Sequence, residues 1–205
     1  KTVCISGSGN VAIFAAEKVI QLGGKVVTLS DSSGFIHDAN GITEEKLKHI
    51  KDLKNNKRAR ISEYANEYPE AKYFADQAPW TISCDVALPC ATQNEIDQSD
   101  AQTLIENGCI AVSEGANMPT TLKGIQCFQE AKILFAPSKA ANAGGVAISG
   151  LEMSQNSARI TWKEAELQKL LFDIMENIHS ECEKYGRESK DYINYVKGAN
   201  IAGFI

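Results

Sequence analysis

The stretch from Val3 to Ala12 constrains the fold of this chain more than any other. It runs from the apolar residues Val3-Cys4-Ile5 into Gly7-Ser8-Gly9-Asn10-Val11-Ala12, a Gly-x-Gly-x-x-Ala turn at the start of a helical pattern. In such a turn the first glycine permits the tight bend, and the second lets a diphosphate approach the main chain. The small third residue lets strand and helix pack closely. Because the helix also offers unpaired N–H groups and its positive dipole end, the stretch predicts a dinucleotide site.

The residues that follow supply the context that this turn requires. Asn10 to Leu22 carries apolar residues at helical spacing, and Gly23-Gly24 ends that helix. Lys25 to Leu29 is predicted as a second strand. Asp31 comes next, where a carboxylate is expected to meet the adenosine ribose.

The polar segment from Ser30 to Gly34, predicted as a loop, bears on which coenzyme is bound. A carboxylate such as Asp31 pairs with a ribose 2′-hydroxyl and favours NAD, whereas a 2′-phosphate requires hydroxyl donors and cations. Ser32 and Ser33 supply hydroxyls, and the segment from Lys54 to Arg60 supplies cations. Such a run is equally typical of a solvated helix end, so the residues alone leave NAD and NADP open.

Helical and strand patterns alternate through the following residues. They predict helices at 43–53 and 61–68, strands at 71–74 and 84–88, a helix from a Ser99–Gln102 capping box to Glu106, a strand at 109–112, a helix at 120–131 and a strand at 132–135. This alternation predicts a doubly wound α/β fold of the Rossmann type, with about six mainly parallel strands.

Three of the predicted strands end in small and polar residues. The segments are 89–94, 114–119 and 136–146, and they carry Thr92, Asn117 and Asn142. Because ligands bind at the carboxyl edge of an open parallel sheet, we expect these side chains to share one rim. Amides and a hydroxyl among small neighbours suit a nicotinamide carboxamide and its ribose.

The last quarter of the chain is predicted to be helical. A helix from near Val146 continues over 150–157, and a Thr161–Glu164 capping box opens a long helix. Its apolar stripe is predicted to pack in the core and comprises Leu167, Leu170, Leu171, Ile174, Ile178 and Cys182. His179 has no second ligand at helical spacing, and His37 and His49 are expected at the surface, so no metal site is predicted.

Composition excludes several classes of protein. The chain has 205 residues, with 21 Lys and Arg against 26 Asp and Glu, so its net charge of -5 favours neither nucleic acid nor a membrane surface. Six cysteines without a CxxC pair indicate free thiols in a reducing compartment, the cytoplasm, rather than zinc or disulfides. No apolar run is long enough to span a bilayer. We expect one domain over 1–205, with 146–205 as its helical C-terminal part.

The loops and the glycine turn together resemble the C-terminal, coenzyme-binding domain of hexameric glutamate dehydrogenase. The matching segments run from one end of the chain to the other. The first residues are predicted to lie in a strand and the last in a helical segment, so we expect the chain to be part of a longer protein. The segments that carry the resemblance are 7–12, Leu88-Pro89-Cys90-Ala91-Thr92-Gln93-Asn94, Glu114-Gly115-Ala116-Asn117-Met118-Pro119-Thr120-Thr121, the run 136–156, Asn194-Tyr195, and Gly198 to Phe204. It implies that an N-terminal substrate domain precedes these residues in the whole enzyme, a homohexamer.

The resemblance also implies roles for individual residues. Gly7, Ser8, Gly9, Asn10 and Val11 would hold the pyrophosphate, and Asp31 and Ser32 would meet the adenosine ribose. Ala91, Thr92, Asn117 and Asn142 would line the nicotinamide side, and Val146 and Ser149 would reach the glutamate. The Ser30–Gly34 segment is similar to that of NADP-preferring members, in which Lys54 and Arg60 lie near the 2′-phosphate, so NADP is expected and NAD remains possible.

No catalytic residue is expected in this chain, because the family's catalytic lysine and aspartate belong to the N-terminal domain. Lys139 is expected only to shape the rim. The resemblance implies an NADP-dependent glutamate dehydrogenase that interconverts glutamate with 2-oxoglutarate and ammonia, whereas these residues alone would bind without turnover. The alternatives are the same domain of a leucine or phenylalanine type dehydrogenase, and a noncatalytic nucleotide-binding module.

Overall fold

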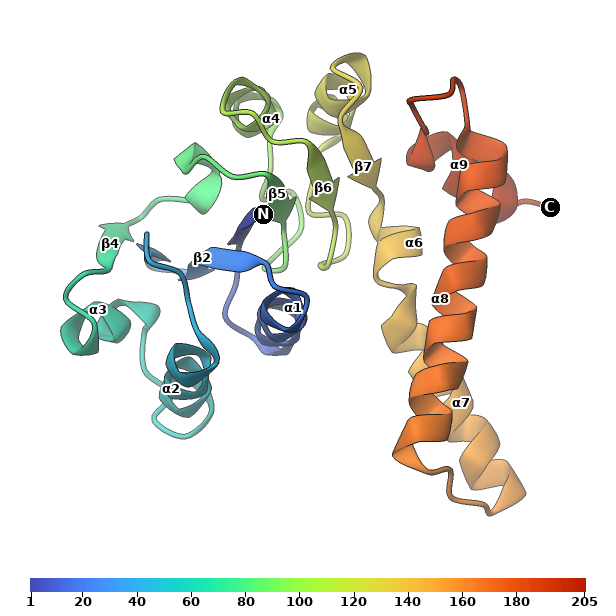
Figure 1. Cartoon of the computed structure of the whole chain (residues 1–205), viewed down its shortest axis with the longest axis horizontal. Coiled ribbons are helices and arrows are strands. Elements are labelled where there is room, and N and C mark those ends of the chain that lie inside the picture. Colours follow the sequence, from blue (N-terminus) through green and yellow to red (C-terminus); the bar gives the residue numbers. More distant parts are fainter. The chain divides into compact units, whose positions relative to one another are not determined.

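The computed structural model describes residues 1–205 and divides into two compact units, Lys1–Phe135 and Ala136–Ile205. The first contains the sheet and the second is helical (Figure 1). Helical structure in the second unit begins with α6 (Ser138–Ala141) and α7 (Ala143–Ala158), earlier than the expected residue 146. That 1–205 is one domain stays a prediction.

The first unit is built on a seven-stranded mixed sheet in the order β4-β3-β2-β1-β5-β6-β7. The strands are β1 (Thr2–Ile5), β2 (Lys25–Asp31), β3 (Gly34–His37), β4 (Lys72–Ala75), β5 (Val86–Leu88), β6 (Ala111–Ser113) and β7 (Leu134–Ala136). β1 pairs in parallel with β2 and β5, and β5 pairs in parallel with β6. The α/β class with a doubly wound sheet is confirmed.

The sequence analysis was wrong about the segment that follows β2. Ser30 and Asp31 belong to β2, and Ser32 and Ser33 form a two-residue turn into β3, which pairs antiparallel with β2 and β4. The sheet therefore has an additional strand and an antiparallel edge. A serine pair followed by glycine is typical of a loop, but apolar residues resume directly afterwards at Phe35 and Ile36, both fully buried, and form β3.

Helices lie on both sides of this sheet. α1 (Asn10–Gln21) and α2 (Glu44–Asn55) lie on one side, and α4 (Gln98–Glu106) and α5 (Leu122–Glu130) on the other (Figure 1). The short α3 (Tyr64–Glu67) follows a 3₁₀ turn. The main core joins α1, α2 and the first three strands, and its fully buried members include Ala16, Ile50, Val26, Leu29 and Ile36.

Helix starts follow side-chain caps that the sequence analysis partly misplaced. Thr43 and Thr121 cap α2 and α5 as N-cap residues. The capping box of α4 is Asp97 with Asp100, not Ser99 with Gln102. The Asp97 carboxylate accepts a hydrogen bond from the Asp100 N–H, and the Asp100 carboxylate accepts one from the Asp97 N–H.

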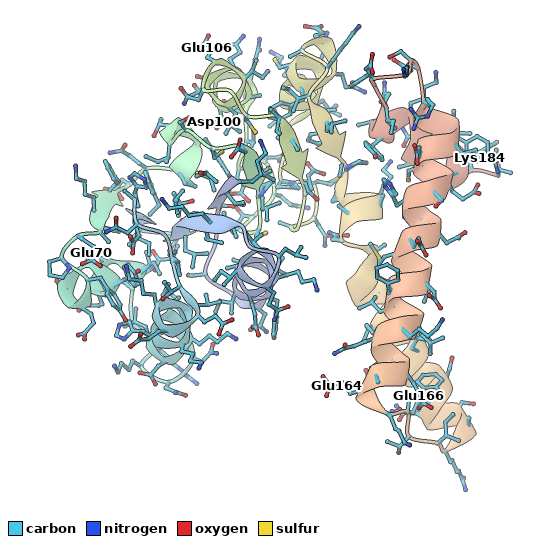
Figure 2. All side chains as sticks on the ribbon, in the orientation of Figure 1. Glu70, Asp100, Glu106, Glu164, Glu166 and Lys184 are labelled. Carbon is cyan, nitrogen blue, oxygen red and sulfur yellow. The ribbon has the colours of Figure 1, made fainter.

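The second unit packs α7 and α9 (Tyr195–Ala202) against the long α8 (Glu164–Gly186). α8 does not begin with the predicted Thr161–Glu164 box, because the Glu166 carboxylate accepts from the Lys163 N–H instead. Glu164 and Glu166 lie at its first turn and Lys184 at its last, which complements the helix dipole (Figure 2).

The stripe of α8 is only in part the core that was predicted. Cys182 is buried, but Leu170 is 36% exposed and the remaining members are half-buried. The closest packing is at α9, where Gly198 lies so near the Cys182 carbonyl that any side chain there would overlap it. The stripe therefore buries one end of α8 within this unit and leaves the rest partly accessible.

His37 and His49 were expected at the surface, and both are half-buried. Burial lowers the pKa of His37. The ring of His49 packs edge-on against Tyr68 at 5.5 Å between centroids, so the polar sequence around it concealed a packing role.

None of the helices combines the length and the apolar character that crossing a bilayer requires.

Candidate functional site

The order of the strands creates a crevice at the carboxyl end of β1. β1 lies between β2 and β5, so the strand order reverses at β1. Ligands of open α/β sheets bind in the crevice at such a switch point. A cavity of about 640 Å³ lies there. Its lining comes from the segments that follow β1, β2, β4 and β5, and comprises Gly7, Ser8, Gly9, Ser30, Asp31, Ser32, Gly34, Asp76, Gln77, Ala78, Pro79, Cys90, Ala91, Thr92 and Glu95.

The glycine turn is fixed by contacts that only glycine permits. Gly7 has a φ of +84°, and a Cβ on it would lie 2.9 Å from the Cys90 carbonyl oxygen. Its N–H donates to the Ser30 hydroxyl at 2.7 Å, and its carbonyl accepts from the Ser30 N–H at 3.0 Å. The turn is therefore held between the ends of β2 and β5 before any ligand binds.

The first turn of α1 is open to an anion. Gly9 is the N-cap residue, supplies no side-chain cap, and has open space where a Cβ would stand. No acidic residue lies in this turn, and Asn10 and Val11 are exposed. The positive end of the helix dipole and its N–H groups thus face a surface on which a phosphate fits.

Asp31 does not offer a free carboxylate to the cavity. One oxygen accepts from the N–H and hydroxyl of Ser33, at 3.0 and 2.6 Å. The other accepts from Lys54 Nζ at 3.0 Å and from the Ile61 N–H at 2.8 Å. Burial alone would raise the pKa of Asp31, but these four hydrogen bonds outweigh it and lower the pKa to about 2.

Lys54 and Arg60 contact residues at the β2–β3 turn, and their role at a 2′-phosphate stays a prediction. Lys54 is held by Asp31 and by the carbonyl of Ala59, and Arg60 Nη1 donates to the Ser32 hydroxyl at 2.7 Å. Lys54 is partly buried, so a wholly solvated helix end does not describe it, whereas Arg60 is exposed and its hydrogen bond to Ser32 lies at the surface. The description as a solvated helix end holds for Arg58, which is exposed.

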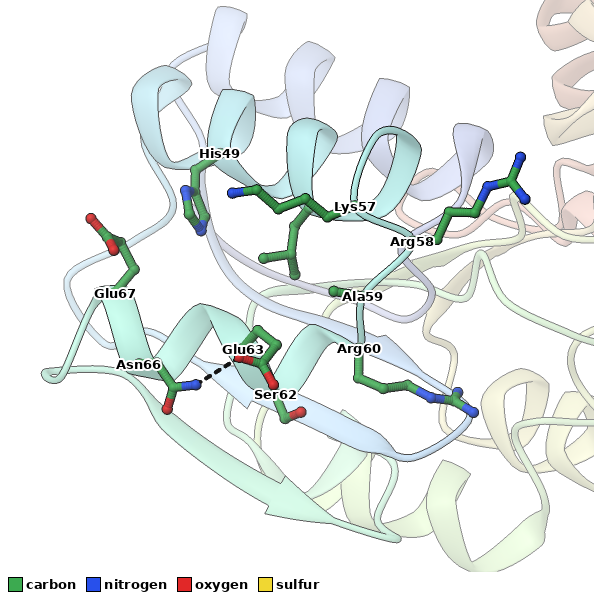
Figure 3. Close-up of a pocket in the computed structure, with 10 residues that line it drawn as sticks. His49, Lys57, Arg58, Ala59, Arg60, Ser62, Glu63, Asn66 and Glu67 are labelled. Carbon is green, nitrogen blue, oxygen red and sulfur yellow. Dashed lines mark hydrogen bonds between the residues drawn. The ribbon is translucent and has the colours of Figure 1, made fainter.

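A second groove, of about 530 Å³, borders the same segment between α2 and α3 (Figure 3). Lys57 extends along it toward His49, and Glu63 accepts from the Asn66 side-chain amide at 2.8 Å (Figure 3). Arg60 extends away from these residues in the same view. Arg60 therefore borders this groove through part of its length and bonds Ser32 of the first cavity through its guanidinium, whereas Lys57 and Arg58 line only the groove.

Two of the three predicted rim loops adjoin one another. The carbonyl of Pro89, after β5, accepts from the N–H groups of Gly115 and Ala116, after β6. The Asn94 N–H donates to the Met118 carbonyl at 3.0 Å. The loops that carry Thr92 and Asn117 are therefore joined through their backbones.

The remaining predicted residues belong to the second unit. Asn142 does not directly follow β7, since α6 intervenes, and it lies between α6 and α7. Val146 and Ser149 are exposed on α7, and the Ser149 hydroxyl donates to the Gly145 carbonyl. Lys139 donates to the Asn200 side chain at 2.5 Å, which ties α6 to α9.

Sequence reasoning missed the residues that hold these loops in place. Ser6 and Ser30 brace the glycine turn, Tyr73 donates to the Ser33 carbonyl, and Glu95 accepts from the loop after β5. Hydroxyls at strand ends beside a glycine turn, and a carboxylate three residues after Thr92, were the available signals.

The site as a whole fits an anionic dinucleotide. It combines a glycine turn that leaves room for close approach, an uncapped helix N-terminus, a pair of cations beside a hydroxyl at one end, and adjoining polar loops at the other.

Comparison with known proteins supports this interpretation. The family model for glutamate/leucine/phenylalanine/valine dehydrogenase matches residues 1–205. The chain is 58% identical over 205 residues to an NAD(P)-specific glutamate dehydrogenase of Xylanibacter ruminicola, and 54% identical over 206 residues to an NADP-specific glutamate dehydrogenase of Haemophilus influenzae. Each alignment covers 100% of this chain and 46% of the relative, so the chain spans about half the length of these relatives.

The solved structures agree with the sequence relatives. The crystal structure of Plasmodium falciparum glutamate dehydrogenase superposes on 99% of this chain with a TM-score of 0.94 and 48% sequence identity. The chain covers 44% of that structure.

Proposed function

Because the chain belongs to the glutamate/leucine/phenylalanine/valine dehydrogenase family, we propose that it is the coenzyme-binding half of an NADP-dependent glutamate dehydrogenase. The reaction is the reversible conversion of L-glutamate, NADP and water into 2-oxoglutarate, ammonia and NADPH. The observation that carries the proposal is the cavity at the β1 switch point, whose glycine turn and uncapped helix fit a diphosphate.

The residues of this chain bind and orient. Ser8, Gly9, Asn10 and Val11 present main-chain groups to the diphosphate. Asp31 does not contact the ribose directly in this proposal: it holds Lys54 beside Ser32, and Lys54, Arg60 and Ser32 receive the 2′-phosphate.

The polar loops after β5 and β6 bind the nicotinamide in this proposal. Ala91, Thr92 and Asn117 border it from the first unit. From the resemblance, Asn142 is also proposed to bind the nicotinamide, and Val146 and Ser149 are proposed to bind the substrate. The bound coenzyme supplies hydride transfer at the substrate α-carbon. Proton transfer is assigned to no residue of this chain, and the enzyme is proposed to act as a homohexamer in the cytoplasm on small-molecule substrates.

Steady-state assays of the full-length protein test the proposal. We expect NADP-dependent oxidation of glutamate and NADPH-dependent reductive amination of 2-oxoglutarate, with much lower rates for leucine and phenylalanine. The 205-residue chain alone should bind NADPH without turnover. A preference for leucine would move the protein to another branch of the family. Absence of dinucleotide binding would favour a noncatalytic module and contradict the proposal, as would turnover by the chain alone.

A further inference from the structure

The loop that follows β5 is closed by a carboxylate. Glu95 Oε1 accepts from the N–H of Ala91 at 2.9 Å and from the N–H of Thr92 at 3.3 Å. Both donors belong to exposed residues that line the cavity. Glu95 therefore sets the direction in which Ala91 and Thr92 face it.

The main chain at Glu95 is held in place by buried neighbours. Its carbonyl accepts from the indole N–H of Trp80 at 3.3 Å, and Trp80 is completely buried. The next residue, Ile96, is also completely buried and donates its N–H to the Pro119 carbonyl at 2.9 Å. Because these hydrogen bonds anchor the main chain at Glu95, its side chain can hold the loop with little further conformational freedom to lose.

The same carboxylate reaches the glycine turn through Ser6. The Ser6 hydroxyl accepts from the Cys90 N–H at 2.9 Å, and Ser6 also lowers the pKa of Glu95. Ser6 immediately precedes Gly7, which lies against the Cys90 carbonyl. The loop after β5 is thus joined to the residue before the glycine turn by the hydrogen bond between Cys90 and Ser6, and Ser6 acts on Glu95 as well.

The charge on Glu95 is not favourable for the fold. Burial raises the pKa of Glu95 and the neighbouring charge of Asp100 adds to the rise, while the hydrogen bonds from Ser6, Ala91 and Thr92 only partly offset it. The groups with the largest effects on its pKa include no cation. The carboxylate therefore acts on the loop geometry at some cost to stability.

We propose that Glu95 is a positioning residue that holds Ala91 and Thr92 for the nicotinamide half of the coenzyme and leaves the adenosine half unaffected. The inference rests on the proposed coenzyme function of this cavity. It assigns the geometry of this end of the site to a half-buried carboxylate of the cavity lining, and not to the exposed Thr92 alone.

Binding of two ligands to the full-length protein tests the proposal. NADPH spans both halves of the site, and adenosine 2′,5′-bisphosphate occupies only the adenosine half. For Glu95→Ala we expect about tenfold weaker binding of NADPH, as for the loss of a hydrogen-bonded group that orders a loop, with bisphosphate affinity within about twofold of the original. The exposed N–H groups left behind can bind water, so the fold should persist.

Conservative variants separate reach from charge. Glu95→Gln keeps the acceptor oxygen at the same distance and should bind NADPH within about threefold of the original protein. Glu95→Asp keeps the charge but is one methylene shorter, so it should resemble Glu95→Ala. Asp97→Ala is the matched control, because it removes the cap of α4 two residues away and should lower the unfolding temperature without changing the ratio of the two affinities.

The outcomes distinguish the two levels of inference. Original NADPH affinity in Glu95→Ala, or parallel loss of both ligands, would overturn the role of Glu95. If Glu95→Ala fails to fold, the order of Gln and Asp decides, and equal affinities for these two would count against the proposal. A starting protein that binds neither ligand would contradict the coenzyme function itself.

Discussion

Two carboxylates at opposite ends of the same cavity have opposite electrostatic surroundings. Asp31 accepts four hydrogen bonds, one of them from Lys54, and its pKa falls to about 2. Glu95 accepts from neutral groups and lies beside another acid, and its pKa is raised. Burial opposes ionisation at both positions, so the difference comes from the partners.

This difference shows how each end of the cavity can recognise a ligand. At the Asp31 end, the carboxylate fixes a cation and a serine turn, which together suit a phosphate. At the Glu95 end, the carboxylate fixes a loop of small residues and adds no cation, which suits an uncharged amide and a ribose. We therefore expect charge to select the ligand at the Asp31 end and shape to select it at the Glu95 end.

The largest effect is expected at Gly7, where the two ends meet. Gly7→Val would place side-chain atoms against the Cys90 carbonyl at a φ that valine avoids, so we expect destabilisation by about 2 kcal/mol or more and loss of NADPH binding. Thermal unfolding and NADPH titration measure the two effects.

Gly9→Ala is the matched control, because a Cβ there meets nothing within 4 Å. Stability should be almost unchanged, whereas NADPH should bind at least about tenfold more weakly, since the methyl group lies where the diphosphate approaches. Unchanged affinity would separate the glycine turn from ligand binding and remove the main support for the proposed function.

Next in size is the effect of Arg60→Ala on the choice of coenzyme. Arg60 holds the Ser32 hydroxyl beside Lys54, so its removal should weaken NADPH by about tenfold and leave NADH within about twofold. Arg58→Ala is the control, because Arg58 is exposed and makes no contact with the β2–β3 turn. Equal losses for the two coenzymes would mean that charge does not select at this end.

The sequence identified Asp31 by its distance from the glycine turn, but not what it does. Its four donors come from Ser33, Lys54 and Ile61, which meet only when α2 and the following 3₁₀ turn pack beside β2. Periodicity predicted each of these elements, and it could not predict their contact. From the residues alone, the cations from Lys54 to Arg60 could therefore be assigned equally to a solvated helix end or to a phosphate site.

Local conformation limited the prediction elsewhere. Glu95 lies only three and four residues from its donors, yet its function depends on the anchoring by Trp80, which is distant in sequence. β3 was missed because a two-residue turn of serines resembles a loop. Thr92 and Asn117 were correctly placed after strands, since an apolar run followed by small residues is a strong local signal, whereas α6 separates Asn142 from β7.

The pH dependence of stability should change in Asp31→Asn. A carboxyl with a lowered pKa stabilises the fold fully above its ordinary value of 3.8, and that contribution is lost as the pH falls from there toward about 2. The original protein should therefore be the more stable at pH 7, and the difference should shrink between pH 4 and pH 2. Urea unfolding at each pH measures it, and a difference independent of pH would show that the charge of Asp31 is not what stabilises the turn.

Glu95→Gln should show the smallest effect, and with the opposite sign. A carboxyl with a raised pKa lowers stability increasingly as the pH rises above its ordinary value of 4.5, since the unfolded chain releases the proton first. The variant, which has no proton to lose, should therefore be slightly more stable than the original protein at pH 7, and the gap should close below pH 4.5. The same urea series measures both carboxylates. If both variants lost stability at pH 7 in the same way, the two ends of the cavity would be electrostatically alike, and the division between charge and shape would have to be abandoned.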